Sequence, residues 1–168
     1  DVEHWRNQSK ATDGPVYGRI INTSSEAGLL GSAGQPNYAT AKGGIIQLTL
    51  STAQGMARYG VTANAIAPRA LTQMTESLGG FDATDGDFEV FAPENVSPLV
   101  AYLGSPDAGQ VSGQVFVVWG RQISVLDGPT VARQFDTDDH WTPEAVDAAL
   151  TPFYESRKPI RDGFLLRY

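Results

Sequence analysis

The chain has 168 residues, enough for one ordinary domain and too few for two of average size. Its net charge of -7 argues against a general nucleic-acid or anionic-membrane binder, because either would need clustered Lys and Arg. Cys is absent, which excludes disulfide and thiolate-metal sites and favours a cytoplasmic location. No apolar run reaches the roughly 18 residues that a membrane span needs, so we expect no membrane partner.

The first half of the chain alternates helical and strand patterns. Pro36 is tolerated in the first turn of a helix, and Gly60 is a plausible C-cap for the same helix. A β-branched run before this helix and a second apolar run after it predict buried strands. The predicted elements, in chain order, are the end of a helix at 2–10, a strand at 18–23, a glycine-rich loop at 31–35, a helix from Pro36 to about Tyr59 and a strand at 61–67.

The second half begins with a long segment, 69–91, that shows no sustained period. Long loops in compact domains are usually lids or unstructured segments, and we expect 74–91 to be a lid over substrate. The predicted elements that follow are a helix from Pro93 to Gly104, a strand at 115–118, a strand at 123–125 beside it and a helix from Thr142 to about Phe153. This order of elements predicts an α/β fold with a mainly parallel sheet.

A phenol and an ammonium stand four residues apart near the start of the long predicted helix, at Tyr38 and Lys42. This spacing places both on one helical face, where the cation favours the phenolate form. Such a Tyr can exchange a proton with an alcohol or ketone near neutral pH. Ser25, 13 positions before Tyr38, could hold the same substrate oxygen. On its own the Tyr-x-x-x-Lys pattern is weak, because a surface Tyr and Lys on one turn is its usual explanation.

The motifs around this pair make the pattern specific. They are RIINTSS at 19–25, QPNY at 35–38, Lys42 and NAIAP at 64–68, in that order. Together they resemble the second half of a short-chain dehydrogenase/reductase, over about 18–116. Residues 67–75, 93–103 and 113–118 look most like (3R)-hydroxyacyl-CoA dehydrogenase units and their actinobacterial single-domain relatives. β-Ketoacyl carrier-protein reductases share some of these residues, so the acyl carrier stays open.

The resemblance implies a role for individual residues. Ser25, Tyr38 and Lys42 would be catalytic, and Ser24 is the competing oxygen anchor. The residues that would bind the cofactor are Tyr38, Lys42, Pro68, Leu71 and Thr72, with Thr75 as a substitute for the last two. No metal site is expected, since His4 and His140 look like surface residues.

Arg69 departs from the family pattern, which usually has a glycine at this position. A solvated loop cation is one explanation for it, and a contact with a phosphate of an acyl carrier is another. The segment after Pro68 also looks one residue shorter than the common form.

The resemblance also implies a fold: the C-terminal part of a doubly wound, mainly parallel Rossmann-like sheet with helices on both faces. The nucleotide-binding N-terminal half is absent from these residues, so we expect the first strand to form an unpaired edge. The chain would be a single partial domain over 1–168. Its catalytic half would cover about 1–128, and a C-terminal extension with one helix would cover about 129–168.

The implied function is an NAD- or NADP-dependent oxidoreductase, with NAD slightly favoured. It would interconvert a secondary alcohol and a ketone, best a 3-hydroxyacyl and 3-oxoacyl thioester, as a homodimer or homotetramer with no nucleic-acid partner. One alternative is a non-catalytic half-domain that needs a partner or a preceding segment. Another is a dehydratase or epimerase that uses the same Tyr and Lys without net redox change.

Overall fold

The computed structural model describes residues 2–72 and 84–157, in two compact units. One unit lies within residues 1–127 and the other within 128–162. Each unit is described by itself. No helix in these described ranges has both the length and the apolarity needed to cross a membrane.

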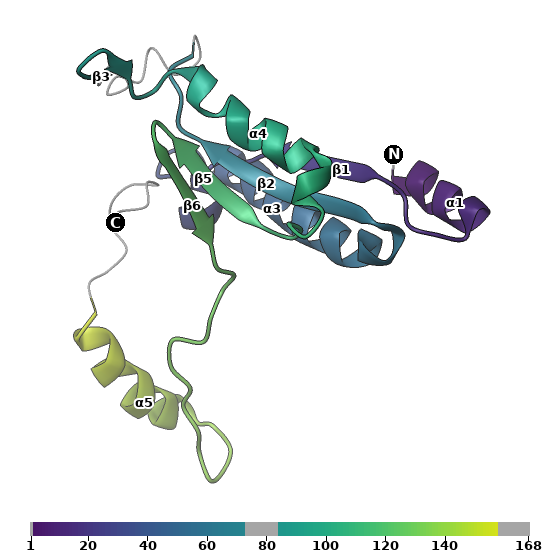
Figure 1. Cartoon of the computed structure of the whole chain (residues 1–168). Helices are drawn as coiled ribbons and strands as arrows, with labels where there is room; N and C mark the ends of the chain where they lie inside the picture. Colours follow the sequence, from purple (N-terminus) through teal and green to yellow (C-terminus); the bar gives the residue numbers. More distant parts are fainter. Residues whose placement is uncertain (1, 73–83, 158–168) are drawn as a thin grey trace. The chain divides into compact units, whose positions relative to one another are not determined.

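The first unit is built on a four-stranded sheet in the order β1-β2-β5-β6 (Figure 1). The strands are β1 (Gly18–Thr23), β2 (Val61–Pro68), β5 (Val115–Trp119) and β6 (Gln122–Leu126). β1, β2 and β5 run parallel, and β6 is antiparallel to β5. This confirms the predicted α/β fold with its mainly parallel sheet. Among the described residues β1 lies at one edge of the sheet, as predicted.

Helices cover both faces of the sheet, as predicted. Helix α3 (Pro36–Met56) packs on one face and α4 (Ser97–Gly104) on the other (Figure 1). Neighbouring residues of a strand point to opposite faces, so each strand supplies both cores. The core under α3 contains Ile46, Ala65 and Val115. The core under α4 contains Ile66, Leu99, Leu103, Phe116 and Val118.

The N-terminal helix closes the end of the sheet opposite to the C-termini of the parallel strands. Helix α1 (Val2–Thr12) brings Trp5 against a buried cluster of Met56, Tyr59 and Val61. Tyr59 belongs to η1 (Ala57–Tyr59), a single 3-10 turn in which the long helical segment ends. The predicted C-cap, Gly60, has a φ of 79°, a left-handed conformation that glycine adopts without strain.

Besides the 3-10 turns, three short elements among the described residues were not predicted. They are helix α2 (Ala27–Leu30) and the hairpin strands β3 (Thr84–Asp85) and β4 (Phe88–Glu89), which lie in the segment predicted as a loop. Elements of two to four residues are too short to show a hydrophobic period. The helix predicted from Pro93 begins as a 3-10 turn, η3 (Pro93–Asn95), before α4; another, η4 (Pro106–Ala108), follows α4.

Among its described residues, 128–157, the second unit has one helix, α5 (Pro143–Glu155), close to its predicted range. Thr142 caps it: the Thr142 hydroxyl accepts a hydrogen bond from the Ala145 N–H at 3.2 Å. A hydrogen bond with its own backbone and one with Thr142 lower the pKa of Glu144. This carboxylate therefore stabilises the helix above its ordinary pKa, and the contribution is lost as the pH falls through the lowered pKa.

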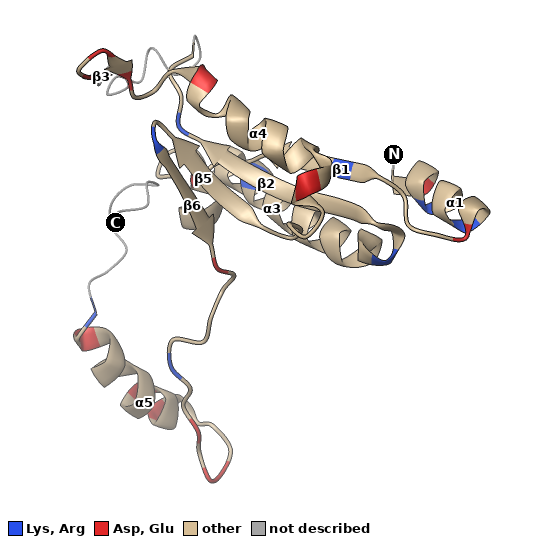
Figure 2. Ribbon diagram, viewed as in Figure 1, with Lys and Arg blue, Asp and Glu red and all other residues tan. Residues whose placement is uncertain are grey.

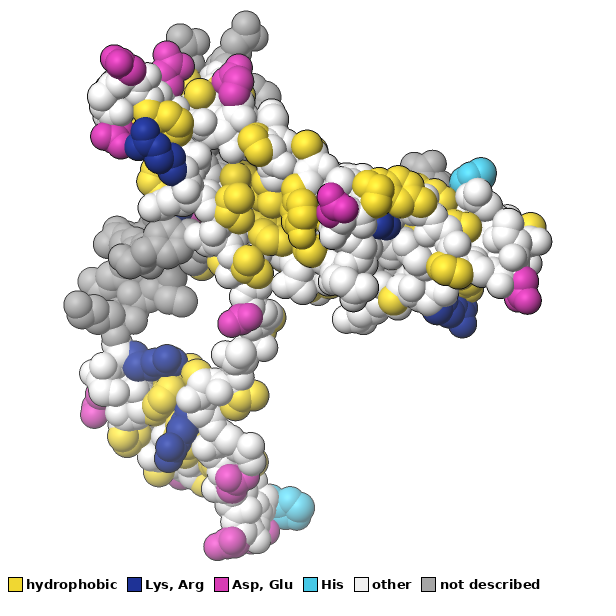
Figure 3. Space-filling view, in the orientation of Figure 1, with side chains coloured by type: hydrophobic (Ala, Val, Ile, Leu, Met, Phe, Trp, Pro, Cys, Tyr) yellow, Lys and Arg dark blue, Asp and Glu magenta, His cyan; other side chains and the backbone are white. Residues whose placement is uncertain are grey.

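The face of the sheet that carries α4 is strongly apolar. Neither α4 nor β5 contains a charged residue (Figure 2). In the space-filling view, hydrophobic side chains gather over α4 and the adjoining strands (Figure 3). On β6, Ile123 is 57% exposed and Val125 59%, opposite Val118 and Phe116 of the buried cluster. In the described part of the chain, α4 thus covers this face only in part.

Leu103 tests how far stability depends on the core under α4. Its side chain is fully buried at 0% exposure. In the full-length natural protein we expect Leu103→Ala to lower the free energy of unfolding by about 2–5 kcal/mol, because truncation leaves a cavity. Urea denaturation measures this change. Tyr102→Ala, at a 47% exposed position of the same helix, is the control and should cost much less. Equal losses for the two variants would contradict this packing.

Candidate active site

The candidate residues gather at one edge of the sheet, where the parallel strands end. Ser25 follows β1, Pro68 ends β2 and Trp119 ends β5. The carboxyl ends of parallel strands meet at the same edge, and open α/β sheets bind their ligands there. The topology therefore brings residues from three distant segments to one place.

The two serines after β1 have different surroundings. Ser24 is 3% exposed, and its hydroxyl donates a hydrogen bond to the Lys42 carbonyl oxygen at 2.7 Å. Its backbone N–H donates to the carbonyl oxygen of Ile66, also at 2.7 Å. Ser25 is half-buried, and its Oγ accepts the N–H of Ala27 at 3.2 Å. Ser24 thus holds the backbone in place, which supports Ser25 as the substrate-facing hydroxyl.

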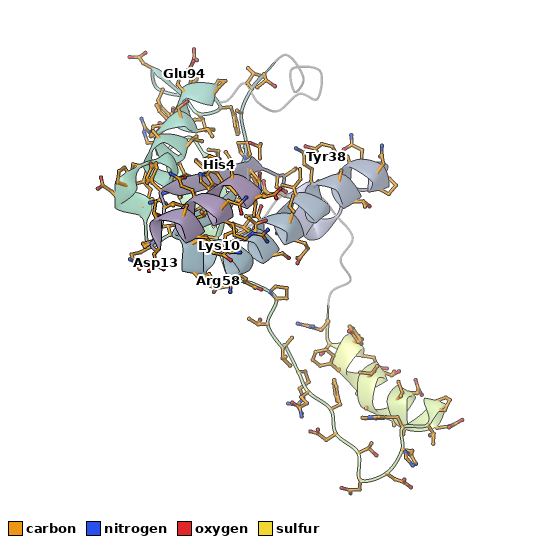
Figure 4. All side chains as sticks on the ribbon, turned by 90° about the vertical axis from the view of Figure 1, so that its right-hand side faces the viewer. His4, Lys10, Asp13, Tyr38, Arg58 and Glu94 are labelled. Atoms are coloured by element: carbon orange, nitrogen blue, oxygen red, sulfur yellow. The ribbon has the colours of Figure 1, made fainter. Side chains whose placement is uncertain are left out.

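Tyr38 and Lys42 lie on the first turns of α3, which starts at Pro36. Tyr38 is 42% exposed. The Lys42 ammonium donates a hydrogen bond to the Thr23 carbonyl oxygen at 3.0 Å, at the end of β1. It lies 5.7 Å from the centre of the Tyr38 ring. Tyr38 and Arg58 lie near opposite ends of this helical segment (Figure 4). Lys42 therefore joins the strand end to the tyrosine.

A close backbone contact fixes the start of α3 against the turn that carries Ser25. Gly28, in α2, packs directly on Lys42: a Cβ built at Gly28 would lie 2.5 Å from the Lys42 carbonyl carbon. A Cβ at Gly43 would lie 3.1 Å from the Gly28 oxygen. Only glycine allows this approach of two helices. Sequence patterns gave no sign of this contact.

The segment after β2 contains the other residues expected to bind the cofactor. Pro68 pairs with Val118 of β5, and Leu71 is 38% exposed. The Leu71 N–H donates to the Phe91 carbonyl oxygen at 2.7 Å. Thr72 is exposed and is the last residue described before 84. Thr75 lies outside the described residues, as does the 74–83 part of the expected lid.

Arg69 is not a solvated loop cation, so that expectation is wrong, while its contact with an acyl-carrier phosphate stays a hypothesis. Its side chain is 12% exposed and forms a two-pronged ion pair with Glu26, which is 4% exposed. The Nε–Oε2 and Nη2–Oε1 distances are both 2.7 Å. The pair spans 43 positions, and no local pattern could have predicted it.

A cavity of about 490 Å³ opens beside Pro68, on the face that carries α4. Its lining is mainly apolar and consists of Thr23, Ile66, Pro68, Ala70, Pro93, Val96, Ser97, Val100 and Ala101. A second cavity, of about 440 Å³, lies near the opposite end of α3, where Lys10, Asp13 and Arg58 are its charged lining (Figure 4). Only the first adjoins the edge that carries Ser25.

His4 and His140 are both exposed. Within residues 2–72 and 84–157, no group of three or more His, Asp or Glu side chains is placed to hold a metal ion.

Comparisons with known proteins identify the family to which this chain is similar. The family model described as short chain dehydrogenase matches residues 6–82. Hydroxyacyl-CoA dehydrogenase ChsB1 of Mycobacterium tuberculosis is 46% identical over 93% of this chain and 50% of its own length. A 3-oxoacyl-[acyl-carrier-protein] reductase of Vibrio cholerae is 41% identical over 61% of this chain and 45% of its own length. The crystal structure of a short chain dehydrogenase from Mycobacterium avium is 44% identical, with a TM-score of 0.78, and covers 94% of this chain.

The chain belongs to the short-chain dehydrogenase/reductase family, and the relatives reported above are named as dehydrogenases and a reductase. It spans about half the length of the relatives that it matches over most of its own length. The resemblance inferred from the motifs is thereby confirmed.

Gly28 tests the contact between α2 and α3. In the full-length natural protein we expect Gly28→Ala to lower the melting temperature, because the added methyl group collides with the Lys42 backbone. Thermal unfolding followed by circular dichroism measures the change. Gly44→Ala is the matched control: Gly44 also lies in α3, but a Cβ there meets nothing within 4 Å. The control should be neutral or stabilising by up to about 1 kcal/mol, since alanine favours the helix. A Gly28→Ala variant as stable as the control would contradict the contact.

Proposed function

We propose that the protein to which this chain belongs is an NAD(P)-dependent oxidoreductase that interconverts a secondary alcohol and a ketone. The observation that carries the proposal is the position of Lys42. Its ammonium is hydrogen-bonded to the end of β1 and lies beside the Tyr38 ring, at the strand edge where Ser25 follows. Family membership supports the same reaction class.

In the oxidation direction, Tyr38 takes the proton of the substrate hydroxyl. The Lys42 ammonium lies beside this tyrosine, 5.7 Å from the centre of its ring. The Ser25 hydroxyl donates a hydrogen bond to the substrate oxygen, and both hydroxyls stabilise the charge that develops there. In the reduction direction Tyr38 returns the proton. The partly exposed ring of Tyr38 leaves its oxygen accessible to substrate.

The chemistry that a bound nicotinamide supplies is acceptance or donation of a hydride at carbon. We propose that Lys42, at the strand edge, would bind the ribose of such a cofactor, and that Pro68, Leu71 and Thr72 would line its nicotinamide end. Leu71 and Thr72 are exposed, and Pro68 and Ala70 of the same segment line the apolar cavity, which supports this proposal. We favour NAD slightly over NADP.

A 3-hydroxyacyl or 3-oxoacyl thioester is the substrate that we propose. Two of the relatives support it by name, one a hydroxyacyl-CoA dehydrogenase and one a 3-oxoacyl carrier-protein reductase. A homodimer or homotetramer in the cytoplasm is the form that we propose, since members of this family are usually oligomers.

The alternative is a non-catalytic half-domain that needs a partner or further residues. The observation that favours it is the length, since this chain covers 50% of the hydroxyacyl-CoA dehydrogenase it resembles. Purified chain 1–168 is tested for binding of a dinucleotide and for its reduction by a 3-hydroxyacyl-CoA. Activity of this chain alone would exclude the half-domain, and activity only after a partner or further residues are supplied would favour it.

Tyr38→Phe tests the proposed chemistry. In the full-length natural protein, this variant should lose about 100-fold or more in kcat with a 3-hydroxyacyl-CoA, because it removes the acid/base oxygen. Formation of reduced nicotinamide from NAD⁺ or NADP⁺ measures the rate. Tyr102→Phe, at a comparably exposed position, should keep full activity. Turnover by Tyr38→Phe at the rate of the unaltered protein would refute the mechanism, and conversion of substrate without net redox change would indicate a dehydratase or epimerase.

A further inference from the structure

The buried pair of Glu26 and Arg69 joins the two halves of the candidate site. Glu26 directly follows Ser25, and Arg69 directly follows Pro68, at the start of the segment proposed to bind the cofactor. Both oxygens of the carboxylate accept hydrogen bonds from the guanidinium at 2.7 Å. A bidentate pair of this kind fixes relative orientation as well as distance.

The turn that carries Ser25 is held on both sides. On the preceding side, Ser24 is tied through its side chain to Lys42 and through its N–H to Ile66. On the following side, the Glu26 carboxylate is paired with the Arg69 guanidinium. Both flanking residues are at least 95% buried, while Ser25 between them is half-buried. The position of the Ser25 hydroxyl therefore depends on both neighbours.

Arg69 is held in turn by the end of β5. Its N–H donates to the Val118 carbonyl oxygen at 3.0 Å, and its guanidinium lies 4.9 Å from the centre of the Trp119 ring. Trp119 stacks on Phe91 at 5.5 Å, and the Phe91 carbonyl accepts the N–H of Leu71. Arg69 thus has a fixed place from which it can position Glu26.

We propose that Glu26 and Arg69 are positioning residues that set the Ser25 hydroxyl relative to the segment 68–72. This inference rests on the proposed function, because it concerns the geometry between the substrate-oxygen anchor and the cofactor wall. Hydride transfer depends steeply on this geometry, and a displacement of about 1 Å can lower a rate about 100-fold. The pair does not touch substrate and acts through Ser25 and the backbone of 68–72.

Stability and positioning can be separated with a double variant. Removing one partner leaves a buried unpaired charge and is destabilising, whereas removing both charges is often nearly neutral. We therefore compare Glu26→Gln, Arg69→Gln and the double variant in the full-length natural protein. Arg69→Lys keeps the charge but loses the two-pronged contact and the planar stack. Arg121→Gln is the matched control, since Arg121 forms an exposed ion pair with Asp85.

For each variant we would measure the melting temperature, the number of sites that bind reduced nucleotide, kcat per bound site and the deuterium isotope effect on kcat/KM. We expect both single variants to melt lower and the double variant to recover most of that loss. The double variant should still have a kcat per site reduced roughly tenfold or more, with a larger isotope effect, because hydride transfer has become slower relative to binding. The kcat per site of Arg69→Lys should lie between those of the double variant and the unaltered protein. The kcat per site of Arg121→Gln should equal that of the unaltered protein.

A purely structural pair would give a different result. It would lower the number of binding sites and leave kcat per site and the isotope effect unchanged, which would overturn the inference. A double variant with unaltered kcat per site would overturn it as well. If the unaltered protein turned over neither a 3-hydroxyacyl nor a 3-oxoacyl thioester with either nucleotide, the proposed function would be refuted. The inference, which rests on that function, would then be refuted as well.

Discussion

The hydrogen bond from the Ser24 hydroxyl to the Lys42 carbonyl connects the end of β1 with the first turns of α3. The positions of Lys42 and Tyr38 relative to Ser25 depend on this connection. It sets where the helix begins relative to the strand, and so where Lys42 and Tyr38 stand. The Gly28 contact reinforces it from the backbone side, because no side chain separates α2 from α3 there. The Lys42 ammonium completes the link by returning to the Thr23 carbonyl. The end of β1 and the first turns of α3 thus hold Ser25, Tyr38 and Lys42 close to one another.

The sheet makes this arrangement rigid. β2 is buried along its length up to Pro68, and its residues alternate between the core under α3 and the core under α4. Asn64 is fully buried in it, yet its side-chain amide is paired: Nδ2 donates to Val111 and Oδ1 accepts the N–H of Gln114. A buried amide with both ends satisfied costs little and fixes the connection before β5. The strand ends that carry Ser25 and Pro68 are therefore placed by a well-packed core.

Much of this could be predicted from sequence, for definite reasons. β-Branched and apolar runs revealed β1, β2 and β5, because buried parallel strands have near-continuous apolar sequences. Pro36 and Gly60 bounded the long helical segment, because each has a fixed backbone preference. The Tyr38 and Lys42 pair could be recognised because it depends on a local spacing. The Glu26 and Arg69 pair could not, because the two residues are distant in sequence and each alone looks like a surface charge. Helix α2 and the 84–89 hairpin were missed because their length gives no period.

Arg69 shows why a position that breaks a family pattern can still be well ordered. A glycine there would leave the segment after β2 held by backbone hydrogen bonds, such as the one to Val118. Arginine adds a second attachment to Glu26 and a third to the Trp119 ring. Burying the two charges costs desolvation energy that their attraction only roughly offsets, so the pair adds little net stability. Its physical consequence is orientation: the guanidinium can satisfy the carboxylate in one geometry only. A departure from the family glycine therefore ties the turn after β1 to the turn after β2, which are the two places where a substrate oxygen and a nicotinamide would have to meet.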